Sequence, residues 1–278
     1  MVKKILGNAY IGALLALLYA PLLVLFLFSF SSTTVLGDWN SFFENISFQP
    51  YIDLFTDTDI LAALGNTLLI GGIASLFATL LGTLAAIGLN NMKKRPAALI
   101  SGISQIPILN ADIITGFSLM IFFLAVNINN GYVSLILAHL VICTPYVVLS
   151  VMPRLSQLNP NLYEAALDLG ATPGQATRKV LIPQLIPGMI SGFILSFTLS
   201  IDDFVISFFN KGTDIDTIST YIYGQYTGKN GLSPAIRALS LVIFVVIFAL
   251  LLLINLRAQR NANANKATAL KTGLKTVK

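Results

Sequence analysis

Charged residues are scarce in this chain. Asp, Glu, Lys and Arg make up 10% of it, whereas they make up about a quarter of a typical soluble domain. Apolar residues make up 55%, and the mean hydropathy is +0.80. This composition excludes a soluble globular protein and indicates a membrane protein. The positions of its charges therefore matter more than the net charge of +5.

Cysteine is also rare in this chain, and the common phosphate-binding motif is absent. Cys143 is the single cysteine, so the sequence excludes a disulfide framework. No G-x-x-x-x-G-K-[ST] segment is present, so we expect this chain to have no ATP site of its own. We also expect no bound metal or other cofactor, no catalytic residue and no nucleic-acid partner.

Long apolar runs dominate what is present. About 20 apolar residues span the roughly 30 Å hydrocarbon core of a bilayer as a helix, and six runs reach that length. We therefore predict an all-α membrane protein with six transmembrane helices, near residues 10–30, 61–89, 97–126, 132–152, 188–209 and 234–256. The second and third runs exceed one span, and we expect them to tilt or break at Gly82, Gly88, Pro107 or Gly116.

A single transmembrane domain is predicted for residues 1–256. Lys3 and Lys4 precede the first run, but that run is too long for a signal-peptide core and no small-residue cleavage site closes it. We interpret it as an uncleaved anchor. Residues 257–278 are basic and rich in Asn, Ala, Thr and Lys, without hydrophobic periodicity, so we predict a disordered tail.

Lys and Arg are concentrated in alternate connections between the runs. Of the 17, 14 lie in the N-terminus, in residues 90–96 and 153–187, and in the tail after residue 256. Because such residues accumulate on the cytoplasmic side, both termini are predicted to be cytoplasmic. The largest connection on the opposite side has no Lys or Arg and carries the acidic residues Asp38, Glu44, Asp53, Asp57 and Asp59.

Three carboxylates fall inside the predicted spans: Asp112, Asp202 and Asp203. Charges inside a membrane are costly and usually functional. Counted along a continuous helix from the cytoplasmic side, Asp112 and Asp202 both lie about 21–23 Å deep. Arg237 is the only protein cation that we identify as a candidate partner. A cationic cargo that moves along a pathway past these acids would therefore explain economically why they lie inside the membrane.

Asp202 and Asp203 are adjacent, and neighbouring residues lie about 100° apart on a helix. We therefore place Asp202 on the pathway and Asp203 partly in helix packing. On the helix face that carries Asp203, small residues recur at every fourth position, at Gly192, Ser196 and Ser200. Membrane helices pack closely through this spacing. The alternative is that all three acids are protonated or satisfied by neighbouring hydroxyls.

The cytoplasmic connection at 153–187 has a defined local structure. Ala165 and Ala166 favour a helix, Gly170 can end it in a left-handed conformation, and Pro173 suits the first turn of the next helix. We predict two short helices joined by a turn. Taken alone, this pattern is also that of an ordinary surface hairpin.

A family resemblance is carried by Glu164-Ala165-Ala166, Gly170 four residues later, and Val180-Leu181-Ile182-Pro183. This pattern resembles the EAA loop of permease subunits in bacterial binding-protein-dependent ABC importers, whose loop ends in Ile-x-Leu-Pro. The resemblance implies the type I importer permease fold, a multi-pass protein of the bacterial plasma membrane, and no enzymatic activity. It also implies that an ABC ATPase dimer, which binds ATP and Mg²⁺, docks on Glu164, Ala165, Ala166 and Gly170.

A narrower resemblance lies in the run from Leu195 to Ser207 and in Thr144-Pro145-Tyr146-Val147-Val148. Together with the EAA segment, these runs resemble the permeases of spermidine/putrescine importers. Asp112 stands where that family has an aspartate after a proline, although Ala111 replaces the proline here. The resemblance implies a second permease subunit and an extracytoplasmic polyamine-binding protein as partners.

Two other functions compete with polyamine import. The first is a permease of the same class for a metal cation, an anion or a sugar. The second is an intramembrane aspartyl protease, in which two carboxylates share a proton. Such proteases carry Tyr-Asp and Gly-x-Gly-Asp motifs, whereas Ala111 precedes Asp112 and Ile201 precedes Asp202 here.

Overall fold

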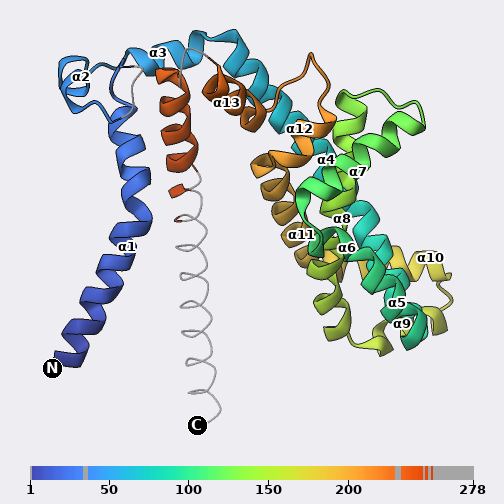
Figure 1. The fold of residues 1–278 in the computed structure, drawn as a ribbon. Coiled ribbons are helices and arrows are strands. Elements are labelled where there is room, and N and C mark those ends of the chain that lie inside the picture. Colours follow the sequence, from blue (N-terminus) through green and yellow to red (C-terminus); the bar gives the residue numbers. More distant parts are fainter. Residues whose placement is uncertain (1, 34–36, 229–232, 247, 250–251, 253–278) are drawn as a thin grey trace. The chain divides into compact units, whose positions relative to one another are not determined.

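The computed structural model describes residues 2–33, 37–228, 233–246, 248–249 and 252. This part of the chain is mostly helical and contains no β-strand beyond one isolated antiparallel bridge between Ser31 and Ile46. It divides into two compact units (Figure 1). The terminal unit comprises residues 1–58 and 225–278, and the central unit comprises residues 59–224. The predicted tail at 257–278 lies outside the described residues.

The terminal unit contains α1 (Val2–Phe28), α2 (Trp39–Glu44), α3 (Gln49–Thr56) and the helical segment Pro234–Val246. Asp38 caps α2 by accepting hydrogen bonds from the hydroxyl and the N–H of Ser41, at 2.7 and 3.2 Å. These bonds lower the pKa of the Asp38 carboxyl below its ordinary value, because they stabilise the charged form. Behind this cap the ring of Phe28 packs against Trp39 and Phe42.

The central unit contains most of the remaining helices (Figure 1). In chain order they are α4 (Thr58–Asn91), α5 (Lys94–Ser104), α6 (Ile106–Leu109), α7 (Asp112–Ala125), α8 (Tyr132–Gln157), α9 (Pro160–Asp168), α10 (Pro173–Ala176), the π-helix η1 (Thr177–Leu181), α11 (Ile182–Asp202), α12 (Val205–Asn210) and α13 (Ile218–Thr227), which ends in the terminal unit.

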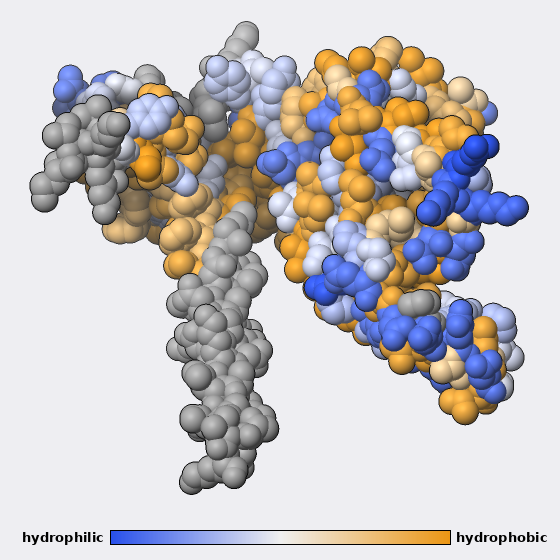
Figure 2. All heavy atoms as spheres, turned by 90° about the horizontal axis from the view of Figure 1, so that it is seen from below, coloured by the Kyte–Doolittle hydropathy of each residue, from blue (hydrophilic) through white to orange (hydrophobic). Residues whose placement is uncertain are grey.

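Four helical stretches among the described residues are long and apolar enough to cross a membrane: Ala9–Phe28, Thr58–Asn91, Tyr132–Gln157 and Pro173–Asp202. They correspond to the first, second, fourth and fifth predicted runs. The third and sixth runs supply the shorter apolar helices Asp112–Ala125 and Pro234–Val246. Apolar side chains are widely exposed on both units (Figure 2), as expected for surfaces that face lipid or other membrane chains.

The second run contains no break among the described residues, so of the two expected outcomes, tilting or breaking, breaking was wrong. Helix α4 continues through Gly82 and Gly88. Gly82 serves helix packing instead, because a Cβ atom at this position would lie 2.6 Å from the Cβ of Val147 on α8. Glycine thus permits close approach of α4 and α8 without bending the helix.

The third run is broken, as predicted, and Pro107 lies in the first turn of α6 after the first break. A second break follows at Asn110 and Ala111, which are both extended. Gly116 does not interrupt a helix, because it lies inside α7. The fifth run is also broken, at Asp203 and Phe204, where no break was predicted.

Helices α8 and α11 pack through the predicted small-residue stripe. A Cβ atom on Gly192 would lie 3.2 Å from Val147, and the hydroxyl of Ser196 donates to the carbonyl of Cys143 at 3.4 Å. The adjoining core is apolar and buried, with Ala78, Ala86, Cys143, Val147, Val151 and Leu185. This close packing fixes the wall of the site described next.

Candidate functional site

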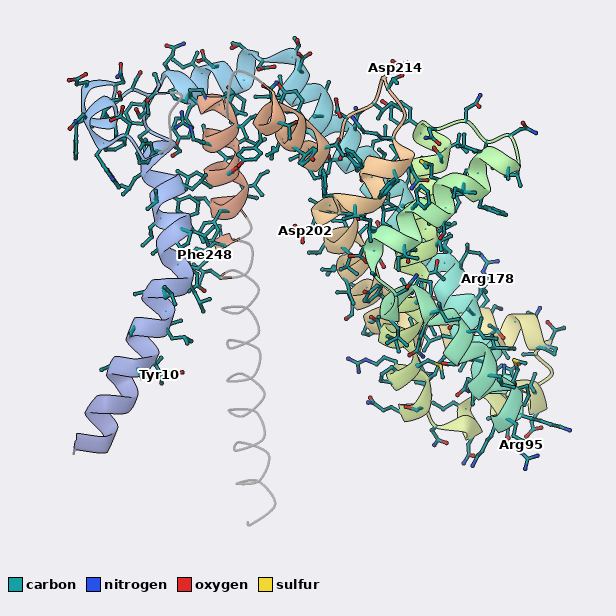
Figure 3. The ribbon with its side chains drawn as sticks, in the orientation of Figure 1. Tyr10, Arg95, Arg178, Asp202, Asp214 and Phe248 are labelled. Carbon is teal, nitrogen blue, oxygen red and sulfur yellow. The ribbon has the colours of Figure 1, made fainter. Side chains whose placement is uncertain are left out.

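The three aspartates of the predicted spans line one cavity of about 290 Å³ in the central unit, which we call the acidic cavity. Its other lining residues are Pro107, Ile142, Tyr146, Leu199, Phe204 and Val205. Asp202 lies between the level of Arg95 at one end of the central unit and that of Asp214 at the opposite end (Figure 3). The cavity thus combines carboxylates with apolar and aromatic walls.

Two helix breaks open onto the acidic cavity. One precedes Asp112, the first residue of α7, and the other follows Asp202, the last residue of α11. The two broken runs also contact each other, because Asn210 of α12 donates its amide N–H to the carbonyl of Gly116 on α7 at 3.3 Å. Broken backbone at membrane depth is tolerated where it is buried in protein or lines a cavity. The second condition is met here, because Asp112, Asp203 and Phe204 line the cavity.

Asp112 and Asp202 are both exposed, but they meet opposite helix dipoles. Asp112 lies at the positive N-terminus of α7, which stabilises its charge. Asp202 lies at the negative C-terminus of α11, which does not stabilise the charge of a carboxylate. A positively charged group in the cavity would therefore gain most beside Asp202. The count along a continuous helix was wrong for Asp112, because two breaks precede it, although both acids line the same cavity.

Asp203 is mostly buried, with 10% of its side chain exposed. Its carboxylate accepts the N–H groups of Ile206 and Ser207, at 3.2 and 2.8 Å, and so caps the start of α12. The expectation that Asp202 and Asp203 face about 100° apart was wrong, because the helix ends between them and both line the cavity. Their environments nevertheless differ, since one is exposed and the other is bonded to the backbone.

Sequence reasoning missed the contributions of His139 and Tyr146, both on α8. Tyr146 lines the cavity, and Nε2 of His139 lies 3.8 Å from Oδ2 of Asp203. The two residues are two helical turns apart and therefore share a face, which was the available signal. The guanidinium of Arg237, the candidate protein cation, donates to the carbonyls of Ser31 and Thr33 within the terminal unit.

The connection at 153–187 folds as the short helix α9, as predicted, and as α10, which continues through η1 into α11, so the prediction that the second helix is also short was wrong. Asn159 caps α9, and Gly170 ends it with a φ of 87°. The N–H of Gly170 donates to Leu167 and that of Ala171 to Ala166, at 2.9 and 3.0 Å, which is the Schellman arrangement. Thr172 and Gln175 then cap α10 reciprocally.

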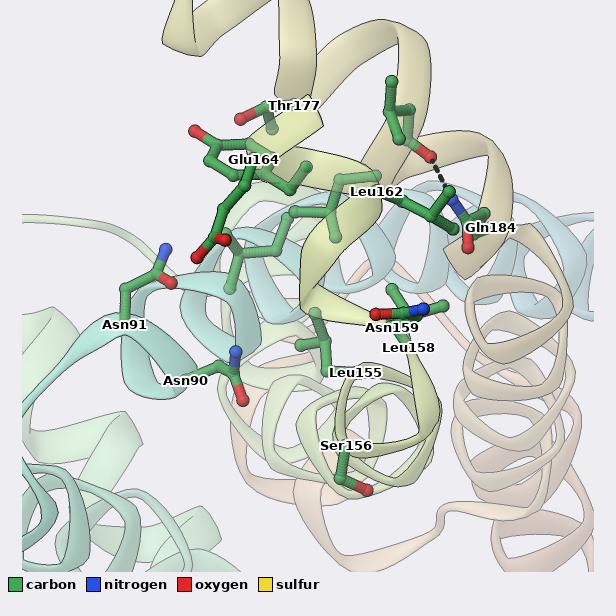
Figure 4. Close-up of a pocket in the computed structure, with 14 residues that line it drawn as sticks. Asn90, Asn91, Leu155, Ser156, Leu158, Asn159, Leu162, Glu164, Thr177 and Gln184 are labelled. Carbon is green, nitrogen blue, oxygen red and sulfur yellow. Dashed lines mark hydrogen bonds between the residues drawn. The ribbon is translucent and has the colours of Figure 1, made fainter. Parts of the chain in front are cut away.

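The residues expected to dock an ATPase lie on the outside of this connection. Glu164, Ala165 and Gly170 are exposed, and Ala166 is half-buried. Glu164 also lines a second cavity, of about 460 Å³, and its carboxylate extends toward Asn91 at the end of α4 (Figure 4). Leu169 is 88% exposed and was missed by sequence reasoning. An apolar side chain presented in this way at a helix end suits a protein contact.

Comparison with known protein families identifies the family of this chain. The model of the binding-protein-dependent transport system inner membrane component matches residues 78–261, which is more than half of the sequence. The chain belongs to this family. It is therefore a membrane permease subunit of a transport system and not an enzyme. The permease interpretation is confirmed, and the protease alternative was wrong.

Two curated relatives are similar to this permease over nearly their whole length. The spermidine/putrescine transport system permease protein PotC of Escherichia coli (strain K12) is 31% identical over 265 residues, which cover 95% of this chain and 98% of the relative. The protein of the same name from Haemophilus influenzae is 33% identical over 261 residues, which cover 94% and 99%. The narrower resemblance noted from the sequence is thereby confirmed.

Among solved structures, the permease resembles a chain of a bacterial ABC transporter involved in the import of the acidic polysaccharide alginate. The TM-score is 0.68, and the match covers 93% of this chain and 95% of the other at 19% identity. This likeness shows the fold of an ABC importer permease.

Proposed function

We propose that this permease forms half of the translocation pathway of an ATP-driven spermidine/putrescine importer. The observation that carries the proposal is the acidic cavity, where Asp112 and Asp202 are exposed beside apolar and aromatic walls. The names of the two curated relatives support the same substrate class. An alternative cargo of the same transport class is an outcome of the test below.

Polyamines match the chemistry of this cavity. They are chains of methylenes with ammonium groups at intervals, so their path needs carboxylates separated by apolar surface. An ammonium can bind Asp112 or Asp202 by charge-assisted hydrogen bonds. The rings of Tyr146 and Phe204 offer cation–π contact, and Ile142 and Leu199 offer apolar surface to the methylenes. Asp203 belongs to the same pathway lining, although its hydrogen bonds are made to the protein.

The proposed topology has six spans, with both termini in the cytoplasm of a bacterium and one permease domain at residues 1–256. The distribution of Lys and Arg supports it, because the exposed cations Arg95 and Arg178 lie in connections assigned to the cytoplasm. The similarity to the alginate transporter supports a type I importer permease fold with this arrangement.

The proposed partners are an ABC ATPase dimer, a second permease subunit and an extracytoplasmic polyamine-binding protein. ATP and Mg²⁺ would bind in the ATPase. Glu164, Ala165, Ala166 and Gly170 would contact the ATPase, and its movement would pass through α10 and η1 to α11, whose first turn contains Pro183. The exposure of α9 and its rigid caps support this role.

Radiolabelled spermidine uptake by the reconstituted complex tests the proposal. Unlabelled spermidine and putrescine should compete, whereas an amino acid and a divalent metal should not. Asp112→Asn and Asp202→Asn should each lower uptake about tenfold or more, because each removes a charge-assisted contact to the cargo. Asp214→Asn, outside the cavity, is the matched control. Competition by only the amino acid or the metal would refute the polyamine assignment.

A further inference from the structure

The break between α11 and α12 lacks the residues that usually interrupt a helix. Residues 202–205 are Asp, Asp, Phe and Val, with neither glycine nor proline. Sharp interruptions without those residues need another cause, such as a side chain that inserts into the backbone hydrogen bonds. The carboxylate of Asp203 caps α12 locally, and contacts with other parts of the fold act together with this cap.

His139 makes contacts on both sides of this break. It lies on α8 and is 1% exposed. Its Nδ1 lies 2.9 Å from the hydroxyl of Ser200, in the last turn of α11. Its Nε2 lies 3.2 Å from the hydroxyl of Ser207, in the first turn of α12. One buried ring therefore connects the end of one helix to the start of the next.

Asp203 completes the connection from within the break. Its carboxylate accepts two N–H groups of α12, and its own carbonyl accepts the hydroxyl of Ser219 on α13 at 2.6 Å. A neutral His139 with its proton on Nε2 directs a donor toward Ser207 and Asp203, while Nδ1 accepts from Ser200. This arrangement satisfies both ring nitrogens. It also places a positive dipole beside the buried carboxylate.

We propose that His139 is a positioning residue that maintains the α11–α12 break and thereby presents Asp202 to the acidic cavity. This inference rests on the proposed function, because it assumes that Asp202 meets the cargo. The two adjacent acids then have different roles. Asp203 is held by His139 and the α12 backbone, and Asp202 remains available to a cation.

A double-mutant cycle of His139→Leu and Asp203→Asn tests this role. Uptake is measured per assembled complex, so that lower insertion is not counted as lower transport. We expect each single variant to lower uptake about tenfold or more and the double variant to be no worse than Asp203→Asn alone, because His139 acts through Asp203. His139→Gln should restore at least part of the uptake, since its amide can donate from the position of Nε2.

Cys143→Ser is the matched control. It lies one turn from His139 in the same buried helix contact, and a serine hydroxyl can replace its bond to the carbonyl of Ser196. Its uptake should equal that of the wild type. Wild-type uptake by His139→Leu, or losses that multiply in the double variant, would overturn the proposal.

Two further measurements keep the proposal open to refutation. If His139→Leu does not assemble, Ser207→Ala decides, because it removes one hydroxyl partner but keeps the backbone N–H that Asp203 accepts. It should lower uptake several-fold, and wild-type uptake would overturn the role of His139. If the wild-type complex takes up no polyamine, the proposed function fails on its own. The same cycle on the thermal midpoint of the complex then decides whether His139 and Asp203 act together.

Discussion

Asp202 and Asp203 are chemically identical neighbours with different surroundings. Asp203 accepts two backbone N–H groups, and Asp202 is exposed at the end of α11. Asp203→Asn should therefore destabilise the complex by about 1–3 kcal/mol, because an amide cannot accept both bonds. Asp202→Asn should leave thermal stability unchanged or raised while lowering uptake, since it removes a charge from a helix C-terminus. Thermal unfolding of the two purified variants, with uptake measured in parallel, checks this difference. Equal stability losses would contradict it.

Gly82 provides a second prediction at the scale of one residue. A methyl group there would meet Val147 at 2.6 Å, so Gly82→Ala should cost about 1–3 kcal/mol by overpacking. Gly88→Ala, on the same helix with no atom within 4 Å of its Cβ position, should be neutral or stabilising. The thermal midpoints of the two detergent-solubilised complexes provide the comparison. A Gly82→Ala midpoint at or above that of Gly88→Ala would show that α4 and α8 can separate without cost.

At this scale the sequence indicated which residues to examine, but not all of their partners. Asp112 and Asp202 attract attention in any apolar run because charge is rare there. His139 did not, because a single histidine in an apolar helix is usually a packing residue. Its proximity to Asp203 depends on how α8 packs against the break between α11 and α12, which is a tertiary contact.

Among the elements, the connection of α9 and α10 was the most predictable. Its caps are local, so Asn159, Gly170 and Thr172 determine where its helices begin and end. The breaks were less predictable. Pro107 indicates the break before α6. At Asp203 and Phe204 the cap on α12 is local, whereas the bonds from His139 on α8 and Ser219 on α13 are tertiary contacts. Tertiary contacts of this kind are invisible to local sequence patterns.

The turn of this connection yields a prediction for coupling. Gly170 has a φ of 87°, and any other residue in that conformation costs about 1–2 kcal/mol. Gly170→Val should therefore change the direction of the chain after α9 and lower uptake while ATP hydrolysis by the complex continues. The quantity to measure is polyamine taken up per ATP hydrolysed.

Gly174→Val is the control for this experiment, because Gly174 is exposed, has no atom within 4 Å of its Cβ position and lies in α10. It should leave the ratio of uptake to hydrolysis near that of the wild type. If both variants lose coupling equally, side-chain bulk is responsible and the left-handed turn is not.

For the molecule as a whole, the positive charges predict the orientation in the membrane. The single cysteine is buried, so a Cys143→Ser background allows single labelling sites to be added. In intact cells a membrane-impermeant maleimide should label Asp214→Cys and not Arg95→Cys, both of which replace exposed residues. Permeabilised cells should show labelling at both. Labelling of Arg95→Cys in intact cells would reverse the proposed topology.

Helix α4 is 34 residues long and unbroken, so its axis extends about 51 Å, well beyond the roughly 30 Å hydrocarbon core. Its final residues, Asn90 and Asn91, border the cavity that Glu164 also lines. Near its other end, Asn66 and Thr67 bond to the backbone of Asp216 and Ile218. A rod of this kind resists shortening, so a push on the end that carries Asn91 would be delivered to the opposite end of the helix as tilt or rotation.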